Sequence, residues 1–136
     1  MPGKKACSEN MNIVDANIIL RYLLQDIEQF INQANEKIEC HSIFIPNEVI
    51  AEVVYVLEKV YKVERVHIFE SLRSLLSYSN ISVDDKNILI EAFRVYSEIK
   101  IDFVDSLLFA YSKVGGHTVF TFDKKLSQML DELSNA

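Results

Sequence analysis

Four acidic residues have positions from which their carboxylates could act together. Asp15 and Asp123 each follow a short apolar segment with the composition of a buried strand, whereas Glu52 and Asp105 lie in predicted helices. In an open parallel sheet, ligands bind at the carboxyl ends of the strands, where the following helices begin. The spacing therefore predicts that these four carboxylates meet at one edge of a sheet.

Each of these acids also has a purely structural interpretation. Asp15 and Asp123 suit the N-cap position of the helix that follows each of them, and Asp102 with Asp105 suits an acidic capping box. Glu52 has no capping role and stands among Ile50, Ala51, Val53 and Val54. We expect it to be buried, and a buried carboxylate must pair, become neutral or bind a cation.

Carboxylate oxygens are ligands for hard divalent cations such as Mg²⁺ or Mn²⁺. Several carboxylates in one cleft suit one or two such ions, and the chemistry they support is attack of a metal-activated water on a phosphodiester. Zinc is not indicated, because His41, His67 and His117 are scattered along the chain and zinc sites use clustered His or Cys.

Composition limits the remaining possibilities. The chain has 136 residues, enough for one domain, and a net charge of −6 that disfavours nucleic-acid binding through positive charge alone. Bound divalent cations would partly remove that objection. The two cysteines are far apart and no apolar run is long enough to cross a membrane, so we expect a cytoplasmic protein without disulfides.

Short apolar segments alternate with helical patterns along the chain, which predicts an α/β fold with a mostly parallel sheet covered by helices on both faces. The expected strands are residues 12–14, 42–45, 80–83 and 118–121. The helices expected between and after them include 26–39, 47–62, 64–77 and 103–114. Asp84 is expected to cap one helix and Asp102 the next. Residues 1–10 are interpreted as an extension outside a single domain of residues 11–136.

Four stretches of the chain resemble the motif regions of PIN-domain ribonucleases, and most closely those of the VapC toxins of toxin–antitoxin pairs. The stretches are NIVDAN (12–17), EVIAEVVYVL (48–57), DFVDSLLFA (102–110) and TFDKKL (121–126). They occur in the family's order and spacing, and the resemblance runs from Met11 to the end of the chain.

The resemblance implies a three-layer α/β/α sandwich and cleavage of RNA that depends on Mg²⁺ or Mn²⁺. Carried over by position, Asp15, Glu52, Asp105 and Asp123 match the family's catalytic, metal-binding quartet. Asp102 is a further acid at a position where the family often has one. Thr121 matches a Ser or Thr that orients the site, and Asn17 lies close enough to Asp15 to hold a water.

The resemblance also implies partners. Family members usually form homodimers, and a cognate antitoxin inhibits each by passing a tail across the acidic cleft, often with a basic side chain. A cleft of four acids would attract such a side chain.

Three classes of protein are considered as alternatives to the nuclease. A phospho-acceptor receiver domain has a similar length and pattern, and Asp84 or Asp85 could imitate its acceptor. Receivers, however, have paired acids after the first strand, where this chain has Asp15 followed by Ala16. A dehalogenase-type phosphatase would need an acid in place of Asn17. A non-catalytic interaction domain with a structural acid cluster is the third alternative.

Overall fold

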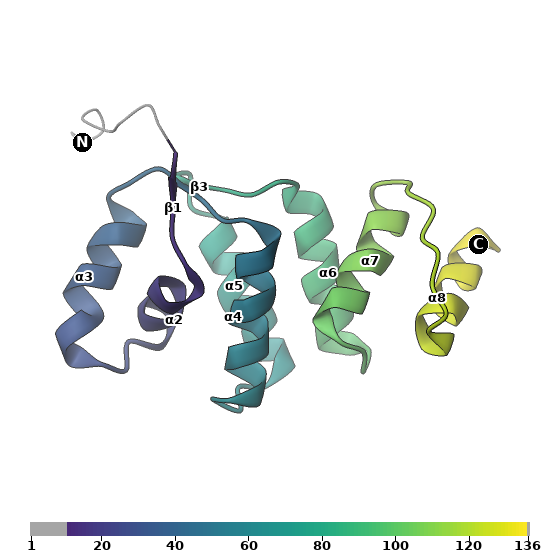
Figure 1. The fold of residues 1–136 in the computed structure, drawn as a ribbon, viewed down its shortest axis with the longest axis horizontal. Coiled ribbons are helices and arrows are strands. Elements are labelled where there is room, and N and C mark those ends of the chain that lie inside the picture. Colours follow the sequence, from purple (N-terminus) through teal and green to yellow (C-terminus); the bar gives the residue numbers. More distant parts are fainter. Residues whose placement is uncertain (1–10, 136) are drawn as a thin grey trace. The chain divides into compact units, whose positions relative to one another are not determined.

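The computed structural model describes residues 11–135 (Figure 1); the predicted extension, residues 1–10, lies outside the described part. The elements follow one another as β1, α2, α3, β2, α4, α5, β3, α6, α7 and α8. The chain divides into two compact units. The first unit comprises the residues up to 63 with residues 74–84, and the second comprises residues 64–73 with the residues from 85 onward. That residues 11–136 form one domain remains a prediction.

The first unit contains a three-stranded sheet. Its strands are β1 (Asn12–Ile13), β2 (Ile43–Phe44) and β3 (Ile81–Ser82), all parallel and in the order β1-β2-β3. Each strand is two residues long, and the pairing of β2 with β3 continues one residue beyond β2, because Ile45 N–H donates to the Ser82 carbonyl oxygen at 2.9 Å. These pairs confirm the predicted α/β class with a parallel sheet.

Three helices complete the described part of the first unit between its strands: α2 (Ala16–Leu24), α3 (Glu28–Glu39) and α4 (Asn47–Lys59). Helix α2 packs against both α3 and α4, as Figure 1 also shows. Each helix buries residues three or four positions apart, because a period of 3.6 brings them to one face. The buried residues of α4 are Ile50, Val53, Val54 and Leu57.

The regular secondary structure of the second unit's described residues is entirely helical. Helices α6 (Lys86–Glu98), α7 (Phe103–Lys113) and α8 (Lys124–Ser134) pack in sequence, α7 lying against both neighbours. Val95, Ile101, Phe109, Leu126 and Met129 form a shared core. Helix α5 (Arg65–Leu76) begins in the second unit and ends in the first.

The fourth predicted strand is wrong. Residues 117–123 are extended but belong to no strand, and Phe120 is 93% exposed. An extended segment becomes a strand only when its backbone pairs with another strand. The described part of the second unit contains no strand that could pair with it.

The helix cap predicted at Asp84 is also displaced by one residue. Asp85 occupies the N-cap of α6, and its Oδ1 accepts a hydrogen bond from the Ile88 N–H at 3.1 Å.

Among residues 11–135, no helix is long and apolar enough to cross a membrane.

Candidate functional site

Asp15 stands where β1 gives way to α2. It is the exposed N-cap of α2, and its Oδ1 accepts a hydrogen bond from the Ile18 N–H at 3.1 Å. The structural interpretation of Asp15 is therefore confirmed. The capping bond uses only one of the two carboxylate oxygens, so capping and ligand binding are compatible. Asn17, in the first turn of the same helix, is exposed.

The expectation that Glu52 is buried is wrong, because Glu52 is exposed. Its apolar neighbours Ile50, Val53 and Val54 form the buried face of α4, and Glu52 projects away from that face. Glu48, one turn earlier, is likewise exposed. The prediction was wrong because residues adjacent in the sequence point to different faces of a helix. Glu52 therefore lies on the exposed face of α4, and burial does not require its carboxylate to pair or to bind a cation.

The second unit holds Asp102, Asp105 and Asp123, called here the second-unit acids. Asp102 is the N-cap of α7, yet its side chain makes no capping hydrogen bond. The expected capping box of Asp102 and Asp105 is therefore wrong. Asp105 lies in the first turn of α7 and is partly buried. Asp123 caps α8, with Oδ2 accepting from the Leu126 N–H at 2.9 Å.

Two of the second-unit acids affect the ionisation of the third. Burial raises the pKa of the Asp105 carboxyl above its ordinary value, and the negative charges of Asp123 and Asp102 raise this pKa further. A carboxylate that stands near other negative charges is stabilised when a cation is placed among them. A cation beside Asp105 would therefore favour the ionised form of its carboxyl.

Thr121 holds the backbone of Asp123. Its Oγ1 accepts a hydrogen bond from the Asp123 N–H at 3.0 Å, a local turn of a kind that Ser and Thr favour. Asp123 is consequently held at both its backbone N–H and its capping carboxylate.

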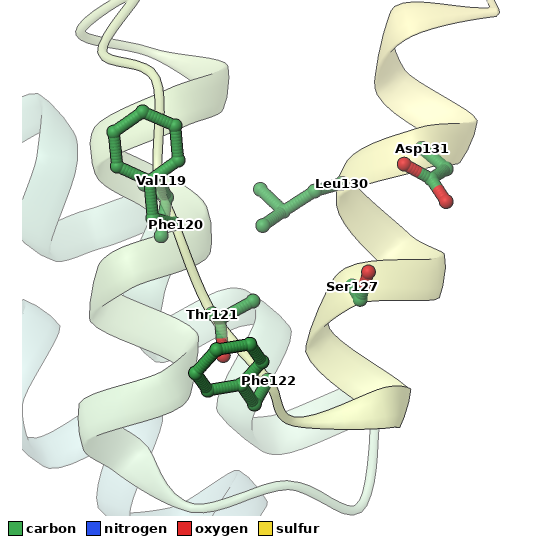
Figure 2. Close-up of a pocket in the computed structure, with 7 residues that line it drawn as sticks. All are labelled: Val119, Phe120, Thr121, Phe122, Ser127, Leu130 and Asp131. Carbon is green, nitrogen blue, oxygen red and sulfur yellow. The ribbon is translucent and has the colours of Figure 1, made fainter.

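A pocket of about 440 Å³ lies beside Thr121 (Figure 2). Residues 119–122 form one wall and Ser127, Leu130 and Asp131 of α8 form the other, with Leu130 pointing toward the extended segment. Asp123 is absent from this lining. The pocket therefore adjoins the acidic region along the chain but is not formed by the acids.

The donor set fits a hard divalent cation in its chemistry, since it consists of carboxylates. The acidic side chains do not, however, form a closed metal centre. Among residues 11–135, no three His, Cys, Asp or Glu side chains are grouped so that they could hold a metal ion. Within each unit, the acids would need water or substrate oxygens to complete a coordination shell.

Sequence reasoning did not identify two residues that fix the start of α7. Ser106 is fully buried, and its Oγ donates to the Asp102 carbonyl oxygen at 3.1 Å. Arg65 donates to the Ile101 carbonyl oxygen at 2.6 Å from a helix 36 positions earlier. Ser106 could have been found from its i−4 spacing to Asp102, whereas no local signal indicates the contact of Arg65.

Comparisons with known proteins agree with the motif pattern. The chain matches the PIN domain family over residues 13–131, a range that contains every acid discussed above. It is 32% identical over 126 residues to a VapC ribonuclease of Aquifex aeolicus, with 88% of this chain and 92% of that protein covered. No solved structure is significantly similar to the chain.

Proposed function

Because this chain belongs to the PIN-domain family, we propose that it is a metal-dependent ribonuclease, the toxin of a toxin–antitoxin pair. The observation that carries the proposal is the similarity to a VapC ribonuclease over nearly the whole of both chains. The four acids of the expected quartet all fall within the matched residues 13–131.

The residues that would hold Mg²⁺ or Mn²⁺ are Asp15, Glu52, Asp105 and Asp123, with Asp102 as a further acid. When bound, such an ion supplies positive charge that attracts an RNA phosphate and promotes ionisation of water for attack on phosphorus. The pKa of Asp105 is raised by burial and, beyond that, by the charges of Asp123 and Asp102; this supports the assignment, because a cation would offset those neighbouring charges. Thr121, through its bond to the Asp123 N–H, would keep Asp123 in place.

The proposal extends to partners and location. An acidic chain with a net charge of −6 would bind RNA through the cations it holds, and it would bind an antitoxin segment that offers Arg or Lys to the same acids. We also propose a homodimer and a cytoplasmic location, in keeping with the family.

The receiver alternative does not survive the family assignment. Asp85, which could have imitated a phospho-acceptor, caps α6. A non-catalytic interaction domain remains as an outcome of the test that follows.

The test is cleavage of RNA by the purified protein with Mn²⁺ or Mg²⁺ and with EDTA, beside the variant Asp15→Asn. Asn caps a helix about as well as Asp, so the variant should fold while losing the carboxylate. Cleavage should require the metal and fall at least about a hundredfold in the variant.

Asp85→Asn is the matched control, because Asp85 caps α6 through the same bond to the third following N–H as Asp15 makes in α2. It should cleave like the original protein. If neither cleavage of any RNA nor calorimetric binding of Mn²⁺ is found, the nuclease is excluded and the chain acts as an interaction domain.

A further inference from the structure

The connection between α6 and α7 determines where two of the second-unit acids begin. Helix α6 ends at Glu98, the connection runs through Ile99 and Ile101, and Asp102 stands at its end. Asp105 lies within the first turn beyond it. Any movement of this connection would therefore move both carboxylates.

Arg65 holds this connection through its backbone. Its Nη1 donates to the carbonyl oxygens of Tyr96, Ile99 and Ile101 at 3.1, 3.3 and 2.6 Å. The last carbonyl groups of a helix lack partners within the helix, and a cation is favourable near them. One guanidinium thus joins the end of α6 to the residue immediately before Asp102.

Arg65 also acts through an aromatic stack. Its guanidinium carbon lies 4.1 Å from the centroid of the Tyr96 ring. Tyr96 meets Phe103, the first residue of α7, edge to face at 5.8 Å, and Phe103 stacks on Phe93 at 5.6 Å. Tyr96 is 1% exposed and Phe103 6%. Because these rings are buried and in contact, the start of α7 is fixed relative to α6.

We propose that Arg65 is a positioning residue for Asp102 and Asp105. It holds the α6–α7 connection so that the two carboxylates keep the separation and exposure that ion binding needs. The part of this inference that concerns ion binding rests on the proposed function, whereas the part that concerns the position of the acids does not.

Three variants separate positioning from other effects. Arg65→Met removes the guanidinium, and Arg65→Lys keeps the charge and donors but loses the planar stack on Tyr96. Arg73→Met is the matched control on the same helix, since Arg73 is exposed and its guanidinium lies 5.9 Å from the Phe69 ring.

The first readout is the Mn²⁺ concentration that gives half-maximal RNA cleavage. Residues that support metal ligands typically alter metal affinity 10- to 100-fold. Arg65→Met should therefore raise this concentration about tenfold or more while the KM for RNA stays unchanged. The Mn²⁺ concentration for Arg65→Lys should lie between those of Arg65→Met and the original protein, and that for Arg73→Met should equal that of the original protein. A folded Arg65→Met protein with unaltered Mn²⁺ dependence would overturn the proposal.

The second readout needs no activity. Amide hydrogen exchange at Ile101 and Ser106, whose N–H groups bond to the Ile99 and Asp102 carbonyl oxygens at 2.9 Å, should quicken at least about tenfold in Arg65→Met and stay unchanged in Arg73→Met.

The two readouts distinguish two failures. If the original protein does not cleave RNA, the proposed function fails, and hydrogen exchange still decides whether Arg65 holds the α6–α7 connection. If exchange is unchanged in Arg65→Met, Arg65 does not position these acids, whatever the cleavage assay shows.

Discussion

The starts of α6 and α7 are built alike and use their acids differently. Asp85 and Asp102 both occupy N-cap positions with extended backbone. Asp85 accepts a hydrogen bond from the Ile88 N–H, whereas the Asp102 side chain makes no capping bond. At α7 the backbone of Asp102 does the anchoring, because its carbonyl oxygen accepts from both the N–H and the Oγ of Ser106.

The electrostatics of the two helix starts differ as well. At α7, burial raises the pKa of Asp105, and the charges of Asp123 and Asp102 raise it further. An arrangement that keeps like charges together and leaves a cap unused costs stability, and such features concentrate at functional sites. The comparison teaches that position at a helix start does not by itself distinguish these acids, whereas the unused cap of Asp102 and the raised pKa of Asp105 do set α7 apart.

The largest expected difference between the two helix starts is in activity. Asp105→Asn should lower RNA cleavage at least about a hundredfold, because it removes a charged ligand from the proposed ion site. Asp85→Asn should leave cleavage within about twofold, since Asn keeps the cap. The measurement is single-turnover cleavage at saturating Mn²⁺. Equal activity in the two variants would remove Asp105 from the mechanism.

A smaller difference is expected in the cost of losing each cap residue. Asp85→Ala should lower the free energy of unfolding by about 1 kcal/mol, the usual value for a capping bond. Asp102→Ala should change it by no more than a few tenths, because no capping bond is lost and repulsion of Asp105 is relieved. Both variants lose the same favourable charge at a helix N-terminus, so urea unfolding at pH 7 isolates the capping bond. Equal losses would mean that Asp102 caps α7 in solution.

Local features of the sequence predicted most of this architecture. The β-branched segments around Ile13, Ile43 and Ile81 became parallel strands, and Asp15 and Asp123 became caps, because strand composition and capping depend on nearby residues. Their positions at strand ends and in helices singled out the four acids, and the family resemblance added their catalytic role; their joint action remains a prediction.

Two failures were local, the cap predicted at Asp84 and the capping box of Asp102 and Asp105, and the others depend on distant residues or on a full helical period. Residues 118–121 have strand composition, but their pairing needs a strand from elsewhere in the chain. Glu52 was misjudged because apolar neighbours in sequence lie on another face of α4. Arg65 could not be found at all, since its acceptors lie 31 to 36 positions away. Sequence patterns thus predicted the elements and most caps but missed these longer-range contacts.

The smallest expected effect is the pH dependence of stability, and it contrasts Asp105 with an acid in α6. Asp105 has a raised pKa in the folded state, so folded protein keeps a proton that unfolded protein releases near pH 4. Its contribution to stability therefore falls as pH rises from about 4 through the raised value. Glu91 is the opposite case, because hydrogen bonds and charges from Arg94 and Lys113 lower its pKa. Its contribution is present above about pH 4.3 and is lost as pH falls.

Neutral variants should accordingly change stability in opposite directions. At pH 7, Asp105→Asn should have a higher free energy of unfolding than the original protein, and Glu91→Gln a lower one. Each difference should be less than about 1 kcal/mol, because both groups are partly solvated. At pH 3 the difference for Asp105→Asn should shrink toward zero, because a carboxyl with a raised pKa is then largely protonated in the folded protein. The difference for Glu91→Gln should be smaller at pH 3 than at pH 7, because the stabilisation from a lowered pKa is lost as pH falls. Urea unfolding at the two pH values measures this. A destabilised Asp105→Asn at pH 7 would show that another contact compensates the repulsion among the second-unit acids.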